Sequence, residues 1–181
     1  MYPDIESMLK WAYCEKAKLN ISGPGMNKLC WKYEPPKYIN DLLIGLSQKD
    51  RIYQAVNIVG IVNELDEVDV SYKELIRAEF GYEREDKDIQ TLMIRIIGLL
   101  GESVNRRRGV RDIVLSYWGE KISQRTIRDH LKCSSNDVYK YKVRICGYLD
   151  STRARSLAIL HERFVKKGLI PGYNQTVVAG R

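Results

Sequence analysis

The sequence predicts an all-α protein, built as a multi-helix body with a helix-turn-helix. Apolar residues recur every three or four positions through most of the chain, which is the spacing of amphipathic helices. Residues that favour helix N-termini, such as Ser47 and Ser123, stand directly before several of these segments. Strand-like stretches are weak, and they occur only at 68–70 and 176–178.

The composition is that of a globular protein of one domain, or of one domain with a small appendage. The chain has 181 residues, of which 44% are hydrophobic and 29% are charged. It contains no apolar run long enough to span a membrane, and its N-terminus, MYPDIESMLKW, has no charged-then-apolar leader. We therefore expect a cytoplasmic protein without a membrane partner.

The cysteines and histidines are too scattered to suggest a metal site, because zinc needs a cluster of thiolate or imidazole ligands. No Cys-x-x-Cys pair occurs among Cys14, Cys30, Cys133, Cys146, His130 and His161. The chain also lacks a Gly-rich phosphate loop, a His-Glu-x-x-His motif and a nucleophile elbow. We expect reduced thiols, no metal, no cofactor and no catalytic residues.

The first part of the chain predicts helices separated by breakers. A helix over 4–18 ends before the Ser-Gly-Pro-Gly breaker at 22–25. A short helix is expected at 38–45. A well-buried helix at about 48–64 follows the capping box that Ser47 forms with Asp50.

Two more helices complete the predicted body. A second capping box, from Ser71 to Glu74, opens a short helix that Gly81 closes. The next helix spans 86–104 and has its apolar residues on one face. The run Arg106-Arg107-Arg108 comes next and, with Gly109, is expected to form a loop.

The stretch 122–146, ISQRTIRDHLKCSSNDVYKYKVRIC, predicts a short helix, a tight turn and a second helix. It follows a helix at 110–118 that Gly119 ends. Ser123 is expected to cap the first helix, and Ser134 or Ser135 the second. Lys132 stands where such turns usually have glycine, so a left-handed turn there would carry modest strain.

The spacing of its apolar residues predicts which face of the second helix is buried: Val138, Tyr141, Ile145, Tyr148 and Leu149. The other face would meet a DNA groove or backbone, where Asn can pair with adenine, Arg with guanine, and Lys or Ser with phosphate. The expected DNA-binding residues of the two helices are Ser123, Gln124, Arg125, Arg128, Ser134, Ser135, Asn136, Tyr139, Lys140 and Arg144. A helical hairpin that contacts only other proteins remains an alternative.

Beyond the second helix, Ser151 is expected to cap a separate helix at about 152–167, which Gly168 ends. The tail from 169 onward is expected to be mobile. These predictions divide the chain into a helical body at 1–104, a helix-turn-helix module at 105–150, and a C-terminal helix with its tail at 151–181.

The positive charge is concentrated in one part of the chain. From Glu102 to Arg155 the sequence has 13 basic and 6 acidic residues, and this difference equals the net charge of +7 of the whole chain. A basic excess confined to one segment is typical of a surface that meets nucleic-acid phosphates. We expect a second nucleic-acid contact at Arg106, Arg107 and Arg108, although a solvated basic loop would look the same.

The segment GVRDIVLSYWGEKISQRTIRDHLKCSSNDVYKYKVRICGYLD resembles the sigma-region-4-like module of phage late-gene regulators. Together with the early helix IESMLKWAYCEKA and the stretch ISGPGMNKL, it is similar to the phage antitermination protein Q group. The SQRxIxxxL-type helix also occurs in many other regulators, and about 65 residues of the chain carry the resemblance. Residues 38–104 match nothing in that pattern, and about 66–104 would be a family-specific insertion.

The resemblance implies an antitermination factor of the host bacterial cytoplasm. Such a factor binds duplex DNA near the late promoter, joins RNA polymerase held by sigma factor, and lets the enzyme read through terminators. Nascent RNA would be a further partner. Two alternatives stay open: an activator of late genes that acts only at initiation, and a small-terminase-like DNA-packaging subunit. A metal-dependent nuclease is disfavoured, because clustered acidic residues such as Asp66, Glu67 and Asp69 fall in an expected loop beside a capping box.

Overall fold

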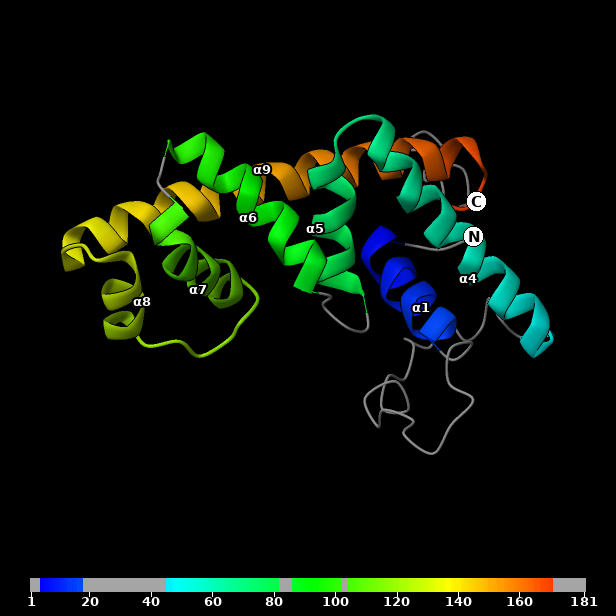
Figure 1. Cartoon of the computed structure of the whole chain (residues 1–181). Helices are drawn as coiled ribbons and strands as arrows, with labels where there is room; N and C mark the ends of the chain where they lie inside the picture. The colour runs from blue at the N-terminus through cyan, green and yellow to red at the C-terminus, as the bar shows by residue number, and fades with distance from the viewer. Residues whose placement is uncertain (1–3, 18–44, 82–85, 102–103, 171–181) are drawn as a thin grey trace, which may run out of the picture. The chain divides into compact units, whose positions relative to one another are not determined.

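A computed structural model describes residues 4–17, 45–81, 86–101 and 104–170 (Figure 1). The predicted helix at 38–45, the breaker at 22–25, the strand-like stretch at 176–178 and most of the predicted mobile tail lie outside these residues. No helix of the described residues is long and apolar enough to cross a membrane.

The prediction of an all-α fold is confirmed for the described residues, which contain helices and no strand. The stretch 68–70, which looked extended in the sequence, is instead a turn and the first residue of a helix. The α-helices are α1 (Ile5–Ala17), α4 (Gln48–Asn63), α5 (Val70–Phe80), α6 (Asp86–Leu100), α7 (Arg107–Tyr117), α8 (Gln124–Leu131) and α9 (Ser135–Lys166). Two short 3-10 helices, η2 (Glu64–Glu67) and η3 (Val104–Arg106), lie between them.

The chain forms two compact units, which differ from the domains expected from sequence. Of the described residues, the first contains 4–17, 45–67, 80–81 and 156–170, and the second contains 68–79, 86–101 and 104–155. Most of α5 and all of α6 therefore belong with α7 and α8 rather than with the N-terminal helices. The helix α9 contributes residues to both units.

In the first unit, α1 packs on α4 (Figure 1). Trp11 of α1 and Ile58 of α4 are both fully buried, as is Phe164 near the end of α9. Glu64, at the end of α4, accepts from Arg163 at 3.3 Å and from Lys167 at 3.2 Å. Burial of large apolar side chains supplies most of the stability of this unit, since partly exposed ion pairs contribute little.

One of the two predicted capping boxes is confirmed and the other is wrong. Ser47 Oγ accepts from the backbone N–H of Asp50 at 3.2 Å, and the Asp50 carboxylate accepts from the backbone N–H of Ser47 at 3.3 Å. At the second site the cap is Asp69, whose carboxylate accepts from the backbone N–H of Ser71 at 2.8 Å. The helix α5 therefore begins at Val70, and Ser71 lies buried in its first turn.

The predicted boundaries between 86 and 109 are also corrected. The helix α6 ends at Leu100 instead of 104, because Gly101 adopts a left-handed conformation with φ of +65°. The arginine run is not a loop: Arg106 ends η3, and Arg107 and Arg108 are the first residues of α7. The helix α7 therefore begins three residues before the predicted start at 110.

The predicted break at Ser151 does not occur, because α9 continues through it as one helix of 32 residues. Thr152 and Ser156 are 4% and 0% exposed, so both side chains pack inside the protein. Burial outweighs the tendency of this Ser-Thr pair to start a new helix. The predicted end at Gly168 is confirmed: its φ is +69°, and its backbone N–H donates to Val165 at 2.9 Å.

A single apolar core holds the second unit together. It joins buried residues of α5, α6, α7, α8 and the first half of α9, including Leu92, Ile113, Ile127 and Ile145. Because this core includes Leu131 of α8 and Val138 of α9, it fixes both helices on either side of the turn that connects them.

Candidate nucleic-acid interface

The helices α8 and α9 are joined by a turn of three residues, Lys132, Cys133 and Ser134. Lys132 has φ of 52° and ψ of 49°, and it is the sole non-glycine residue of the described ranges with a positive φ. A left-handed turn is therefore present although Lys132 replaces the usual glycine, and it carries the strain of a Cβ atom in that conformation. The chain changes direction at this turn, between α8 and α9 (Figure 1).

Serine side chains cap both helices. Ser123 Oγ accepts from the backbone N–H of Thr126 at 3.0 Å, which confirms the expected N-cap of α8. At α9, Ser134 rather than Ser135 is the cap, because its Oγ accepts from the backbone N–H of Asp137 at 3.2 Å. The same hydroxyl donates to the Asp137 carboxylate at 2.7 Å. This bond lowers the pKa of Asp137, and Lys140 at 3.3 Å adds to the effect.

A close approach between α7 and α8 positions the turn. A Cβ atom at Gly109 would lie 2.4 Å from Cγ of Leu131 and 2.9 Å from its backbone nitrogen. Only glycine fits this contact, since both distances are shorter than any real carbon contact. The sequence placed Gly109 in a loop, and no local pattern points to the packing role that it has inside α7.

The two faces of the first half of α9 match the predicted division. Val138, Tyr141, Ile145 and Leu149 are buried, and Tyr148 is half-buried. The outward face consists of exposed polar, basic and apolar residues: Ser135, Asn136, Tyr139, Lys140, Val143 and Arg144. Two large side chains stand out on it, because Tyr139 is 65% and Val143 is 54% exposed. They stand four residues apart, so they lie next to each other on this face of the helix.

The predicted DNA-binding residues at α8 differ in exposure and in whether a carboxylate already pairs with them. Ser123, Gln124 and Arg125 are exposed at the N-terminal end of the helix. Arg128 is half-buried, and its guanidinium donates to Asp129 at 3.1 Å. Arg125 also approaches Asp129, at 3.9 Å. Such exposed pairs are weak and leave Arg125 able to exchange its partner for a phosphate.

The arginine run divides between two hollows of the surface. Arg106 donates to the Tyr141 hydroxyl, and its guanidinium carbon lies 5.7 Å from the centre of the Tyr141 ring. It lines a hollow of about 280 Å³ together with Lys140 and Arg144 of α9. Arg106 therefore lies beside the outward face of α9, whereas Arg107 and Arg108 line a different hollow.

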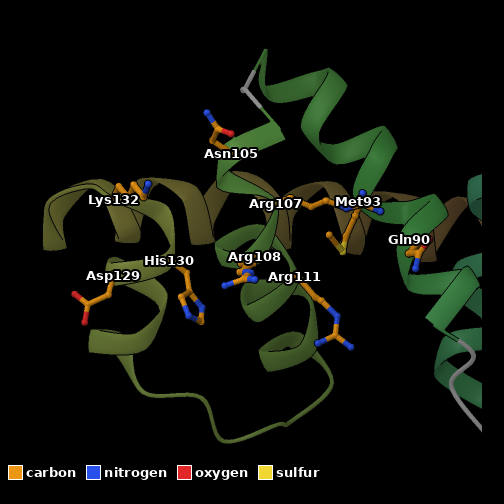
Figure 2. A pocket seen from close by; sticks show the side chains of 9 residues that line it. All are labelled: Gln90, Met93, Asn105, Arg107, Arg108, Arg111, Asp129, His130 and Lys132. Carbon is orange, nitrogen blue, oxygen red and sulfur yellow. The ribbon is translucent and has the colours of Figure 1, made fainter.

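We call this second, larger hollow the basic hollow. It has a volume of about 740 Å³, and its lining residues come from α6, η3, α7, α8 and the turn: Gln90, Met93, Asn105, Arg107, Arg108, Arg111, Asp129, His130 and Lys132. Figure 2 shows Arg108 and His130 between α7 and α8, and Arg107 extending toward Met93. His130 is held there by Asp112, with 2.6 Å between Nδ1 and Oδ2. Arg111, His130 and Lys132 were absent from the predicted site, although Arg111 and Lys132 belong to the basic segment.

Hydrogen bonds along α9 fix its direction in the second unit. Tyr117 of α7 donates through its hydroxyl to Asp150 at 2.8 Å, and Arg153 donates to both carboxylate oxygens of Glu79 at 2.8 and 3.0 Å. Burial, followed by the bond to Asp150, raises the pKa of Tyr117 well above its usual range. Burial also raises the pKa of the Cys146 thiol, so this group is protonated at neutral pH.

Within the described residues, no three His, Cys, Asp or Glu side chains lie close enough together to hold a metal ion. The exposed polar and basic groups described above lie on the outward face of α9, at the N-terminal end of α8 and around the basic hollow. Comparison of the chain with protein-family models, with curated proteins and with solved structures gave no match.

Proposed function

We propose that the protein is a DNA-binding transcription regulator in which α8, the turn and α9 act as a helix-turn-helix. The observation that carries the proposal is the outward face of α9. It presents an amide, two basic groups and two large apolar groups on a helix whose other face is fixed in the core. A helix with such a face fits the major groove of B-DNA, where base edges offer hydrogen bonds and thymine offers a methyl group.

The chemistry of each side chain suggests its part. Asn136, in the first turn of α9, suits the bidentate contact to adenine. Lys140 and Arg144 follow at four-residue intervals and suit guanine or the phosphate backbone. Tyr139 and Val143 supply the apolar contacts. The hydroxyl of Ser135 is exposed at the start of α9 and can donate to a phosphate.

The helix α8 would hold the duplex from the side of its backbone. Ser123, Gln124 and Arg125 are exposed at its N-terminal end, where the helix dipole also favours an anion. Arg128 contributes less, because Asp129 partly neutralises it. Ser134 acts mainly as the cap of α9, so its role is to orient the helix.

We further propose that this regulator is a transcription antitermination factor that works with bacterial RNA polymerase. This part rests on the resemblance of its helix-turn-helix segment to the sigma-region-4-like module of phage late-gene regulators. Sigma factor and nascent RNA are the partners that the resemblance adds. The protein would bind DNA near a late promoter, join the paused polymerase and travel with it through terminators.

The DNA-binding part is tested by selecting duplexes from a random library with the full chain. Enrichment of one sequence, bound more tightly than a scrambled duplex, supports the proposal. Absence of any enrichment, together with equal binding to all duplexes, contradicts it. The selected duplex is then the reagent for the second test.

The antitermination part is tested by transcription in vitro from a template with the selected site at the promoter and a terminator downstream. Readthrough that depends on the protein supports antitermination. More initiation without readthrough indicates an activator instead. A pull-down of RNA polymerase, with and without sigma factor, identifies the state of the enzyme that is bound. Binding to neither form would remove polymerase from the proposal and leave a DNA-binding protein.

A further inference from the structure

The basic hollow carries an inference that goes beyond the groove-reading role of α9. Three guanidinium groups, from Arg107, Arg108 and Arg111, lie on the first two turns of α7. The ammonium group of Lys132 joins them from the turn that precedes α9. Four cationic side chains from two elements therefore line one hollow of the surface (Figure 2).

The carboxylates close to this hollow are engaged by other groups. Asp112 bonds to His130 at 2.6 Å, and Asp129 pairs with Arg128 at 3.1 Å. In the described part of the chain, Arg107, Arg108 and Lys132 form no ion pair. Cationic groups that have no carboxylate partner in the protein attract an anion from outside.

The shape of the hollow favours a polymer over a small molecule. Sites for small ligands are usually concave, mostly apolar and able to enclose the ligand. This hollow is open to solvent, so it would not enclose a small ligand. Guanidinium groups bind phosphate and carboxylate alike with two parallel hydrogen bonds. Several cationic groups along one open hollow match a chain of anions, such as the phosphates of a nucleic acid, better than a single anion.

The lining also favours a duplex over a single strand. Sites for single-stranded nucleic acid combine basic residues with aromatic rings on which the bases stack. Among the described residues that line the hollow, none is Phe, Tyr or Trp. Lys132 is also separated from Asn136, at the start of the outward face of α9, by only three residues. The hollow and the groove-reading face are thus neighbours along the chain.

We propose that the basic hollow binds the sugar-phosphate backbone of the same DNA duplex, outside the segment that α9 reads. Arg107, Arg108 and Lys132 contact the phosphates, and Arg111 adds positive electrostatic potential around them. The proposal rests on the proposed DNA-binding function. Its consequence is a longer footprint, with an outer part whose binding depends on charge and is indifferent to sequence.

The test compares wild-type protein with the double variant Arg107→Gln/Arg108→Gln, which keeps much of each side chain and removes two charges. The control, Lys10→Gln/Arg155→Gln, removes two charges from exposed positions outside the hollow. Thermal unfolding of all three proteins establishes that they are folded. Affinity is measured for the selected duplex alone and for the same duplex extended by about one helical turn of 10 bp on each side. A single-stranded RNA of the same length is the third probe.

The wild type and the control should bind the extended duplex more tightly than the short one, whereas the hollow variant should lose this gain. Loss of two phosphate contacts makes the plot of log K against log salt concentration less steep by about 1.8. The ratio of wild-type to variant affinity should therefore be about 12-fold larger at 50 mM than at 200 mM salt. The loss should be equal for extensions of different sequence.

Three results would overturn the inference. The hollow variant could match the control in affinity and salt slope. This result would leave DNA binding by α9 intact and would show that the basic hollow makes no contact with the duplex. The same variant could lose affinity for the RNA alone, which assigns the hollow to a different nucleic acid. Finally, the wild type could bind no duplex at all, which removes the proposed function and this inference together.

Discussion

Gly109 of α7 and Leu131 of α8 lie so close that a Cβ atom on the glycine would come within 2.4 Å of the leucine Cγ. The contact stands directly before the Lys132 turn, so it fixes where α8 ends and α9 begins. The geometry of the candidate interface thus depends on one glycine that lies outside both of its helices.

Replacing Gly109 by alanine should therefore destabilise the second unit. The added methyl group meets the Leu131 backbone nitrogen at 2.9 Å, and backbone cannot move aside as a side chain can. Overpacking of this kind costs about 1–3 kcal/mol, which urea unfolding measures. The matched control is Gly147→Ala in α9, where nothing lies within 4 Å of the added atom. That variant should gain about 0.5–1 kcal/mol, because glycine is a poor helix former. A Gly109→Ala protein as stable as the wild type would show that the contact relaxes freely.

Lys132→Gly should stabilise the protein, in contrast to most glycine substitutions. Its φ of 52° strains any residue that has a Cβ atom, and glycine removes the strain at some cost in chain entropy. We expect a net gain of about 0.5–1 kcal/mol in the free energy of unfolding. Lys10→Gly, at an exposed position of α1, should lose a similar amount. Equal losses in both variants would contradict the strain. Because Lys132 also lines the basic hollow, its variant should bind the extended duplex more weakly although it is more stable.

Tyr139 and Val143 should make the protein sensitive to thymine methyl groups. If their exposed side chains meet the major groove, replacing thymine by deoxyuridine in the selected duplex removes an apolar contact without changing any hydrogen bond. At the contacted position the affinity should fall about 4-fold, as expected for one buried methyl-sized group. The Val143→Ala and Tyr139→Ala variants should show a smaller difference in affinity between the thymine duplex and the deoxyuridine duplex. Sequence-specific binding by the wild type that ignores this replacement at every position would rule out the apolar contacts.

The cap of α9 should make stability depend on pH in the acid range. The bond from Ser134 lowers the pKa of Asp137 below its ordinary value of 3.8, so the ionised carboxylate favours the folded state. This stabilisation is present above pH 3.8 and disappears as the pH falls through the lower pKa of the folded state. Asp137→Asn should thus melt below the wild type at neutral pH, and the difference should shrink below about pH 3.8. A difference that stays constant with pH would mean that the carboxylate charge has no part in the cap.

Sequence could predict the features that depend on near neighbours in the chain. The caps at Ser47 and Ser123 follow from side-chain bonds that reach only three residues. The turn between α8 and α9 follows from the two amphipathic segments on either side of it, although its left-handed conformation at Lys132 does not. The outward face of α9 follows from helical periodicity, since only the face opposite the apolar residues can be exposed.

Features that depend on distant residues could not be predicted in this way. The arginine run is polar and is followed by glycine, a pattern that favours a loop. The structure instead has glycine at 109 because Leu131, 22 positions later in the sequence, leaves no room for a Cβ atom there. The helix α9 continues past Ser151 because Thr152 and Ser156 are buried by tertiary packing. The basic hollow joins residues of four helical segments and a turn, so its lining emerges only once the second unit is folded.

The central claim, that α9 reads DNA, is tested most directly by the affinity of Asn136→Ala for the selected and scrambled duplexes. Loss of a bidentate base contact should weaken binding to the selected duplex by roughly 5- to 150-fold, equivalent to about 1–3 kcal/mol, and leave the scrambled duplex almost unaffected. Asn57→Ala, at an exposed position of α4, should bind both duplexes like the wild type. If Asn136→Ala instead retains the full preference for the selected duplex, or if both asparagine variants lose it equally, α9 is not the helix that reads the sequence.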